Sequence, residues 1–192
     1  MSQSTLGSLL GASRIQCEAS TTSKKKSLQL VAQLIEDSLD LHDDDDDEDV
    51  DMDVIDALAA REKLGCTGMG HGIAMPHGRV DFVTEPVAAL VTLTDPVDFD
   101  SADNEPVDVV FGLLIPEEKT ELHLHILASV ARFFNDEDNR RKIRNAKTAD
   151  EVLTMLNDCP IGHNENHQNE NQEPDTAADT KRTEKKLSSG NR

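Results

Sequence analysis

The sequence of 192 residues contains no tryptophan or tyrosine and only 5 phenylalanines. A surface that stacks nucleic-acid bases on aromatic rings is therefore not expected. The 3 cysteines, Cys17, Cys66 and Cys159, are odd in number and far apart in the chain. Their spacing predicts neither a disulfide framework nor a metal site, so we expect reduced thiols in a cytoplasmic protein.

Basic residues are also scarce. The sequence has 38 acidic residues and only 19 Lys and Arg, which gives a formal charge of −19. Such a charge repels phosphate backbones and anionic lipid surfaces. We therefore expect no nucleic-acid partner. The negative charge suits either a basic protein partner or a cytoplasm of high salt concentration. The first residues do not show the pattern of a secretory signal, and no stretch of 18 apolar residues occurs in the sequence, so we expect no membrane insertion and a cytoplasmic location.

Two segments lack the apolar residues that a packed core needs. Residues 40–52 belong to an acidic run without Lys or Arg, and residues 159–192 are rich in Asn, Gln, Glu, His and Lys without an apolar period. Both compositions are typical of solvated chain. We predict one domain over residues 1–158, with an acidic loop at 40–52 and a disordered polar tail at 159–192.

The rest of the chain alternates helical and strand-like patterns. Ser23 is a candidate helix cap, and Thr148 with Glu151 forms a capping box before the last helix. Apolar runs bounded by prolines predict strands. We predict helices over 24–39, 53–63 and 120–134, a last helix after 148, and strands over 87–93 and 107–115. These elements predict an α/β fold, a mixed β-sheet flanked by helices on both faces.

His77 is the first candidate for chemistry, because it lies between Pro76 and Gly78. Proline restricts the backbone before the histidine and glycine allows a sharp exit after it, so the imidazole is held by the backbone at a strand end. That arrangement suits a presented nucleophile. A loop histidine bonded to a neighbouring carbonyl is the alternative.

Closely spaced glycines precede and follow this histidine. Their spacing is neither that of a Walker loop nor that of a dinucleotide-binding fingerprint. Successive backbone N–H groups in such a segment can converge on an anion. The candidate phosphoryl-binding loop comprises Gly68, Gly70, Gly72 and Gly78. A flexible connector is the alternative.

Two more side chains are candidates for the same site. His123 falls on the apolar face of its predicted helix and in its first turn, whereas His125 falls toward solvent. The partial positive charge at a helix start disfavours an imidazolium and favours a nearby anion. Arg61, in the last turn of its helix, could clamp a phosphoryl group. A core histidine and a solvated helix-end cation are the alternatives.

The three side chains and the glycines together predict a phosphoryl site. The chain has no Walker lysine and no kinase loop set, so we expect neither a nucleotide cofactor nor a metal. This composition fits phosphoryl relay between histidines.

The sequence resembles the enzyme IIA domains of the bacterial phosphotransferase system, fructose/mannitol class, and within it the nitrogen-related branch. The resemblance is carried by REKLGCTGMGHGIAMPHG, PVDFDSADNEPVDVVFGLLIP and HLHIL, within residues 4–157. It implies a phosphorylated His77, a supporting His123 and an Arg61 that lines the site. The family has Asn at the position of His71, so an added imidazole near the site either supplies an extra donor, slows loss of the phosphoryl group or has no effect.

The resemblance implies a phosphotransferase component that accepts phosphoryl from a histidine phosphocarrier protein. Its phosphorylation state would then regulate partner proteins. One alternative is a sugar-specific enzyme IIA that passes the group to an enzyme IIB for fructose or mannitol uptake. The other is a binding module that is never phosphorylated.

Overall fold

The computed structural model describes residues 4–39 and 54–162. The predicted acidic loop and the tail from residue 163 lie outside the described residues, so the predicted domain boundaries stay a prediction.

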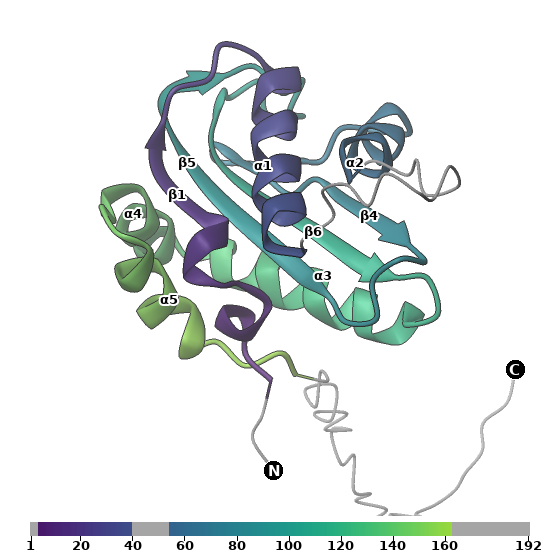
Figure 1. The fold of residues 1–192 in the computed structure, drawn as a ribbon. Coiled ribbons are helices and arrows are strands. Elements are labelled where there is room, and N and C mark those ends of the chain that lie inside the picture. The colour runs from purple at the N-terminus through teal and green to yellow at the C-terminus, as the bar shows by residue number, and fades with distance from the viewer. Residues whose placement is uncertain (1–3, 40–53, 163–192) are drawn as a thin grey trace, which may run out of the picture.

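Five α-helices, two short 3-10 helices and six strands make up the described residues (Figure 1). The N-terminal part comprises η1 (Leu6–Leu9), η2 (Ala12–Arg14), β1 (Ile15–Ala19), α1 (Lys24–Leu39) and α2 (Val54–Lys63). The central part comprises β2 (Gly68–Gly70), β3 (Ile73–Ala74), β4 (His77–Val80), β5 (Val87–Val97) and β6 (Val107–Pro116). The C-terminal part comprises α3 (Thr120–Asn135), α4 (Glu137–Asn145) and α5 (Ala149–Asn157).

The strands form one mixed sheet with the order β1-β5-β6-β3-β2, and β4 also pairs with β6. β5 and β6 run antiparallel, whereas β3 and β4 both run parallel to β6 along the same edge. Met75 and Pro76 separate β3 from β4, and Pro76 has no N–H to donate to the ladder. The interruption places His77 at the start of β4, opposite Leu113 of β6.

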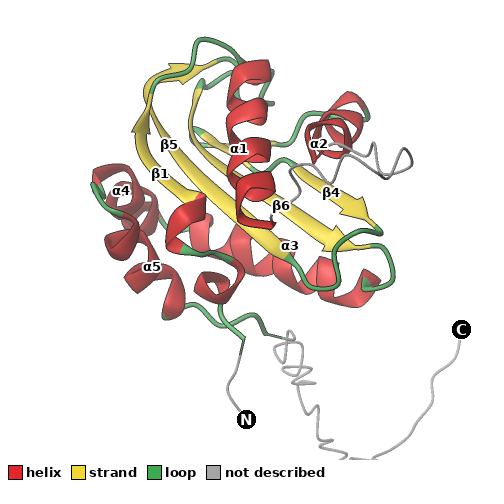
Figure 2. Cartoon of the chain, in the orientation of Figure 1, coloured by secondary structure: helices red, strands yellow, loops and turns green. Residues whose placement is uncertain are grey.

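The sheet is buried on both faces, as Figure 2 shows. Alternate residues of β6 point to opposite sides, so Val110 and Leu114 pack with α1 and α2. Phe111 and Leu113 pack on the other side with residues of α3, α4 and α5. The predicted α/β fold, with helices on both faces of a mixed sheet, is confirmed.

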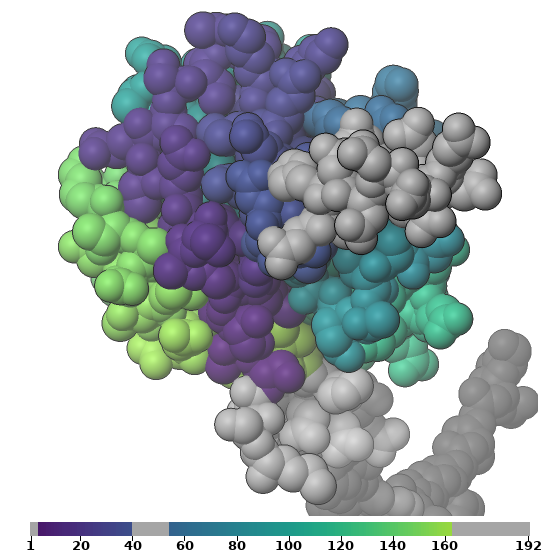
Figure 3. All heavy atoms as spheres, viewed as in Figure 1, coloured from purple at the N-terminus to yellow at the C-terminus, as the bar shows by residue number. Residues whose placement is uncertain are grey.

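The N-terminal segment is held against the end of the last helix. Leu6 donates its N–H to the Cys159 carbonyl at 2.8 Å, and Ile161 donates to the Ser4 carbonyl at 2.8 Å. Figure 3 shows this N-terminal segment in purple beside the yellow-green helix α5. Packing of the first described residues therefore extends the fold to residue 161.

Local signals predicted several elements correctly. Lys26 donates its N–H to the Ser23 hydroxyl at 3.3 Å at the start of α1, and Thr148 and Glu151 form the predicted capping box of α5. The prediction omitted η1, η2, α4 and the four strands β1 to β4. The α4 segment has a single buried apolar residue, Ile143, and so lacks a helical hydrophobic period. Among the described helices, none is long and apolar enough to cross a bilayer.

Candidate functional site

Arg61, His77 and His123 come together at one edge of the sheet, from three different elements. Arg61 of α2 donates its Nε–H to Nε2 of His77 at 3.1 Å. The rings of His77 and His123 lie 5.5 Å apart between centroids and nearly perpendicular, at 79°. The first turn of α3 therefore faces the start of β4, as the helical phase of His123 predicted.

The hydrogen bonds of His77 determine which nitrogen carries its proton. Nδ1 lies 2.9 Å from the Met75 carbonyl, which can only accept, so Nδ1 carries the hydrogen. Nε2 receives the Arg61 N–H and is therefore unprotonated. The nucleophilic lone pair lies on Nε2, directed at a guanidinium that can bind an anion.

The electrostatic environment favours neutral imidazoles. Burial lowers the pKa of His77, the bond to the Met75 carbonyl and the charge of Glu62 raise it, and Arg61 lowers it. The pKa of His123 is lowered by burial first, and then by His77, Arg79 and Arg61. A neutral His77 keeps its Nε2 lone pair available near neutral pH.

These shifts predict a pH dependence of stability. Above about pH 6.5 both the folded and the unfolded histidines are neutral. As the pH falls below this value the unfolded His77 takes up a proton before the folded one does, so the free energy of unfolding decreases. Urea unfolding of the wild type and of His77→Asn should show a stability difference that shrinks as pH falls from 7.5 toward 5. If the free energies of unfolding of the two proteins changed in parallel with pH, the lowered pKa of His77 would be contradicted.

Gly78 allows α2 to approach β4 closely. A Cβ at Gly78 would lie 3.1 Å from the Cβ of Ala57, one helical turn before Arg61. Because Ala57 and Arg61 share a face of α2, contact of Ala57 with β4 places the guanidinium over His77. The glycine therefore contributes to the site through packing.

We expect Gly78→Ala to weaken both the fold and the site. The added methyl should displace α2 by a few tenths of an ångström and cost about 1–3 kcal/mol of unfolding free energy, as other overpacked sites do. It should also shift Arg61 relative to Nε2. Urea denaturation measures the loss of stability, and phosphorylation assays measure the effect on the site. Gly162→Ala is the control, since a Cβ there meets nothing within 4 Å; equal behaviour of the two variants would refute this role.

Gly70 and Gly72 belong to a different part of the sheet. His71 and Gly72 form the two-residue turn between β2 and β3, with positive φ values of 56° and 77°. Two positive φ values characterise a type I′ hairpin, in which Asn-Gly is a preferred pair. Gly72 accepts hydrogen bonds from Asp108 and Val109, whereas His77 pairs with Leu113. Val109 and Leu113 are four residues apart on β6, so the turn and His77 are separated by roughly 13 Å along the strand.

This placement corrects two expectations. Gly70 and Gly72 serve the hairpin and do not form a cradle of N–H groups around His77. Gly68 on β2 pairs with Ala74 and lies against Ser101. His71 lies at the hairpin turn, where its N–H bonds Asp103 at 2.8 Å, and is no extra donor at the site. Of the four glycines, only Gly78 adjoins the histidine.

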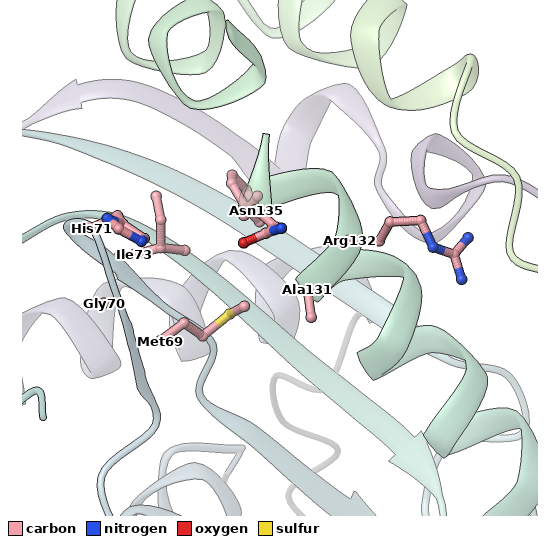
Figure 4. Close-up of a pocket in the computed structure, with 8 residues that line it drawn as sticks. Met69, Gly70, His71, Ile73, Ala131, Arg132 and Asn135 are labelled. Carbon is pink, nitrogen blue, oxygen red and sulfur yellow. The ribbon is translucent and has the colours of Figure 1, made fainter. Parts of the chain in front are cut away.

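A hollow of about 340 Å³ lies between this hairpin and the end of α3. Figure 4 shows Met69, His71 and Ile73 facing Ala131 and Asn135 across it. Asn135 is 12 residues beyond His123, about 18 Å along the helix. The hollow is therefore distinct from the histidine pair.

The sequence reasoning missed Arg79. Its Nη2 donates to the Thr120 hydroxyl at 3.1 Å and to the Glu117 carbonyl, which ties β4 to the start of α3. Strand alternation was the available signal, because residues two apart in a strand share a face and Arg79 follows His77 by two. Arg79 thus holds the first turn of α3, which carries His123.

A neutral imidazole with a free Nε2 lone pair, an arginine and a second neutral imidazole form a set that can accept a phosphoryl group. The nucleophile is Nε2, and Arg61 can pair with phosphoryl oxygens. The hydrogen bonds of Arg61 to His77 and to the Gly65 carbonyl, the latter at 3.0 Å, use two of its five N–H donors.

Comparisons with known proteins identify the family of this chain. Residues 8–159 match the family described as phosphoenolpyruvate-dependent sugar phosphotransferase system, EIIA 2. The nitrogen regulatory protein of Escherichia coli K12 is 37% identical over 147 residues, which cover 76% of this chain and 83% of that protein. That of Pseudomonas aeruginosa is 39% identical over 140 residues, covering 73% and 86%.

A solved structure shows the same fold. The nitrogen regulatory protein IIA-Ntr of Neisseria meningitidis superposes with a TM-score of 0.68 at 34% identity, over 78% of this chain and 97% of that one. The resemblance inferred from the sequence motifs is confirmed. The chain belongs to the EIIA 2 family of the phosphotransferase system and is a phosphotransferase component with nitrogen regulatory proteins among its relatives.

Proposed function

We propose that this protein is a phosphohistidine carrier that accepts a phosphoryl group on Nε2 of His77 from a histidine phosphocarrier protein. Its phosphorylation state then determines which partner proteins it binds. The observation that carries the proposal is the contact of Arg61 with an unprotonated Nε2 next to His123. The nitrogen regulatory relatives favour the regulatory role.

The transfer step balances without a cofactor. The Nε2 lone pair of His77 attacks the phosphorus of the donor phosphohistidine, a new P–N bond forms, and the donor imidazole leaves with the electron pair of the broken bond. Arg61 turns from Nε2 to the phosphoryl oxygens, and His123 donates a hydrogen bond to them. The proton stays on Nδ1 of His77 and keeps its hydrogen bond to the Met75 carbonyl throughout.

The surface around the site suits a protein donor. His77 is only 8% exposed, whereas Leu64 and Leu124 are 86% and 64% exposed. Leu64 follows the helix that carries Arg61, and Leu124 adjoins His123, so an apolar side chain projects from each of the two helix segments that contribute to the site. Exposed leucines next to a recessed nucleophile favour docking of another protein.

A sugar-specific enzyme IIA is the second candidate. The fructose-specific EIIA component of Haloferax volcanii is 35% identical over 122 residues, covering 64% of this chain and 79% of that protein. In this reading the phosphoryl group passes on to an enzyme IIB.

One experiment tests the proposal and separates the candidates. The protein is incubated with labelled phosphoenolpyruvate, enzyme I and a histidine phosphocarrier protein, and acid-labile, alkali-stable label should accumulate on it. Purified fructose-type or mannitol-type enzyme IIB is then added. Retention of the label supports the regulatory carrier, and its transfer supports the sugar-specific enzyme. A protein that takes up no label at all would be a binding module.

A further inference from the structure

An ion pair joins the start of α1 to Glu62, the residue that follows Arg61 on α2. Lys24, the first residue of α1, places Nζ 2.6 Å from Oε1 of Glu62 on α2. The Glu62 side chain is only 7% exposed, and the Lys24 ammonium also donates to the Phe99 carbonyl at 2.9 Å. A charge buried this deeply needs partners in fixed positions, so this pair restrains the relative placement of the two helices.

The Glu62 carboxylate also holds the loop after α2. The Thr67 N–H lies 3.2 Å from each carboxylate oxygen, and the Thr67 hydroxyl donates to Oε2. The Thr67 carbonyl accepts the Met75 N–H at 3.0 Å, and the Met75 carbonyl accepts Nδ1–H of His77 at 2.9 Å. An unbroken series of contacts therefore leads from the carboxylate to one nitrogen of the imidazole.

Nε2, the other nitrogen of His77, is contacted by Arg61, the residue next to Glu62 in the sequence. Arg61 precedes Glu62 in the last turn of α2 and contacts Nε2 of His77. Glu62 therefore acts on both sides of the ring: through Thr67 and Met75 on Nδ1, and through the end of α2 on Nε2.

We propose that Lys24, Glu62 and Thr67 are positioning residues that hold His77 in the Nδ1–H tautomer with the Nε2 lone pair aimed at Arg61. The consequence for phosphoryl transfer rests on the proposed function. A nucleophile held in one tautomer and one orientation reacts faster, because these degrees of freedom are already restricted before the donor docks.

The charges around His77 agree with this role. Burial is the main influence and lowers its pKa, Arg61 lowers it further, and the Glu62 carboxylate raises it. His123 on α3 faces the same ring, and Arg79 on β4 acts on His123. Removing the charge of Glu62 should therefore lower the titration midpoint of His77, in addition to loosening its tautomer.

The test combines transfer kinetics with nitrogen NMR of the imidazoles in the full chain. Glu62→Gln keeps the size of the side chain and removes its charge. We expect phosphoryl acceptance to slow at least tenfold, mainly in kcat, with averaged His77 nitrogen shifts that report mixed tautomers. Thr67→Val should produce a smaller effect, roughly threefold to tenfold, and Lys24→Arg should restore most of what Lys24→Met loses.

The control is Glu18→Gln, which removes an exposed ion pair between Lys147 and Glu18 of β1, a strand that β5 and β6 separate from β4. Wild-type rates and His77 shifts in a folded Glu62→Gln protein would overturn the proposal. If Glu62→Gln does not fold, the same transfer rates and His77 shifts are measured on Thr67→Val and the two Lys24 variants, and wild-type values in all of them would overturn the proposal. If the wild type accepts no phosphoryl, the proposed function fails, and the tautomer and titration of His77 still decide whether these residues position it.

Discussion

Replacing His77 by alanine is expected to abolish phosphorylation completely. The buried ring presents an unprotonated Nε2 to Arg61, and the variant has no nucleophile in its place. The wild type incubated with phosphoenolpyruvate, enzyme I and the phosphocarrier should take up one acid-labile, alkali-stable label per chain. The variant should take up none at equal donor concentration.

Two other histidines serve as controls for this result. His71 lies at the hairpin turn and His125 lies on α3 beyond His123. Alanine at either position should leave the extent of labelling as in the wild type. Labelling of His77→Ala at the wild-type level would show that another residue carries the group. His77→Asn should also remain folded, since its amide can still bond the Met75 carbonyl.

The second large effect is expected at His123. Its ring faces His77, and in its neutral form it can donate one hydrogen bond to the phosphoryl oxygens. Loss of one transition-state donor of this kind costs at least about 1.4 kcal/mol, a factor of ten in rate. His123→Ala should therefore slow acceptance of the phosphoryl group at least tenfold in rapid-quench measurements, while labelling still reaches completion.

His125 provides the matched comparison on the same helix. Two residues correspond to about 200° around a helix, so His125 points away from the side that carries His123. His125→Ala should change the rate little. Equal losses from the two substitutions would mean that both histidines act through the helix itself and that His123 makes no contact with the group being transferred.

Much of this fold was accessible from sequence because its signals are local. The helix cap at Ser23 and the capping box at Thr148 use side chains within three residues of the groups they bond, and both lie where predicted. The β6 segment is apolar enough to require burial on both faces. The segment of α4 has almost no apolar residues, so its pattern gave no such signal.

The glycine-rich segment shows where local reasoning was insufficient. Closely spaced glycines are compatible with an anion nest, a connector or a tight hairpin, and the sequence alone left these open. Pairing of β3 with β6 selects the hairpin, which puts Gly70 and Gly72 roughly 13 Å from the histidine. The positive φ of His71 follows from that turn.

By itself, the sequence determined the class of fold and the candidate histidine. Hydrophobic period and caps act over one or two turns, and Pro76 and Gly78 act on the backbone of His77 directly. Only the tertiary structure decided which partners His77 has. Arg61 is 16 residues away, and it reaches Nε2 because Gly78 lets Ala57 and α2 approach β4. Such contacts depend on how separate elements pack, which no local pattern encodes.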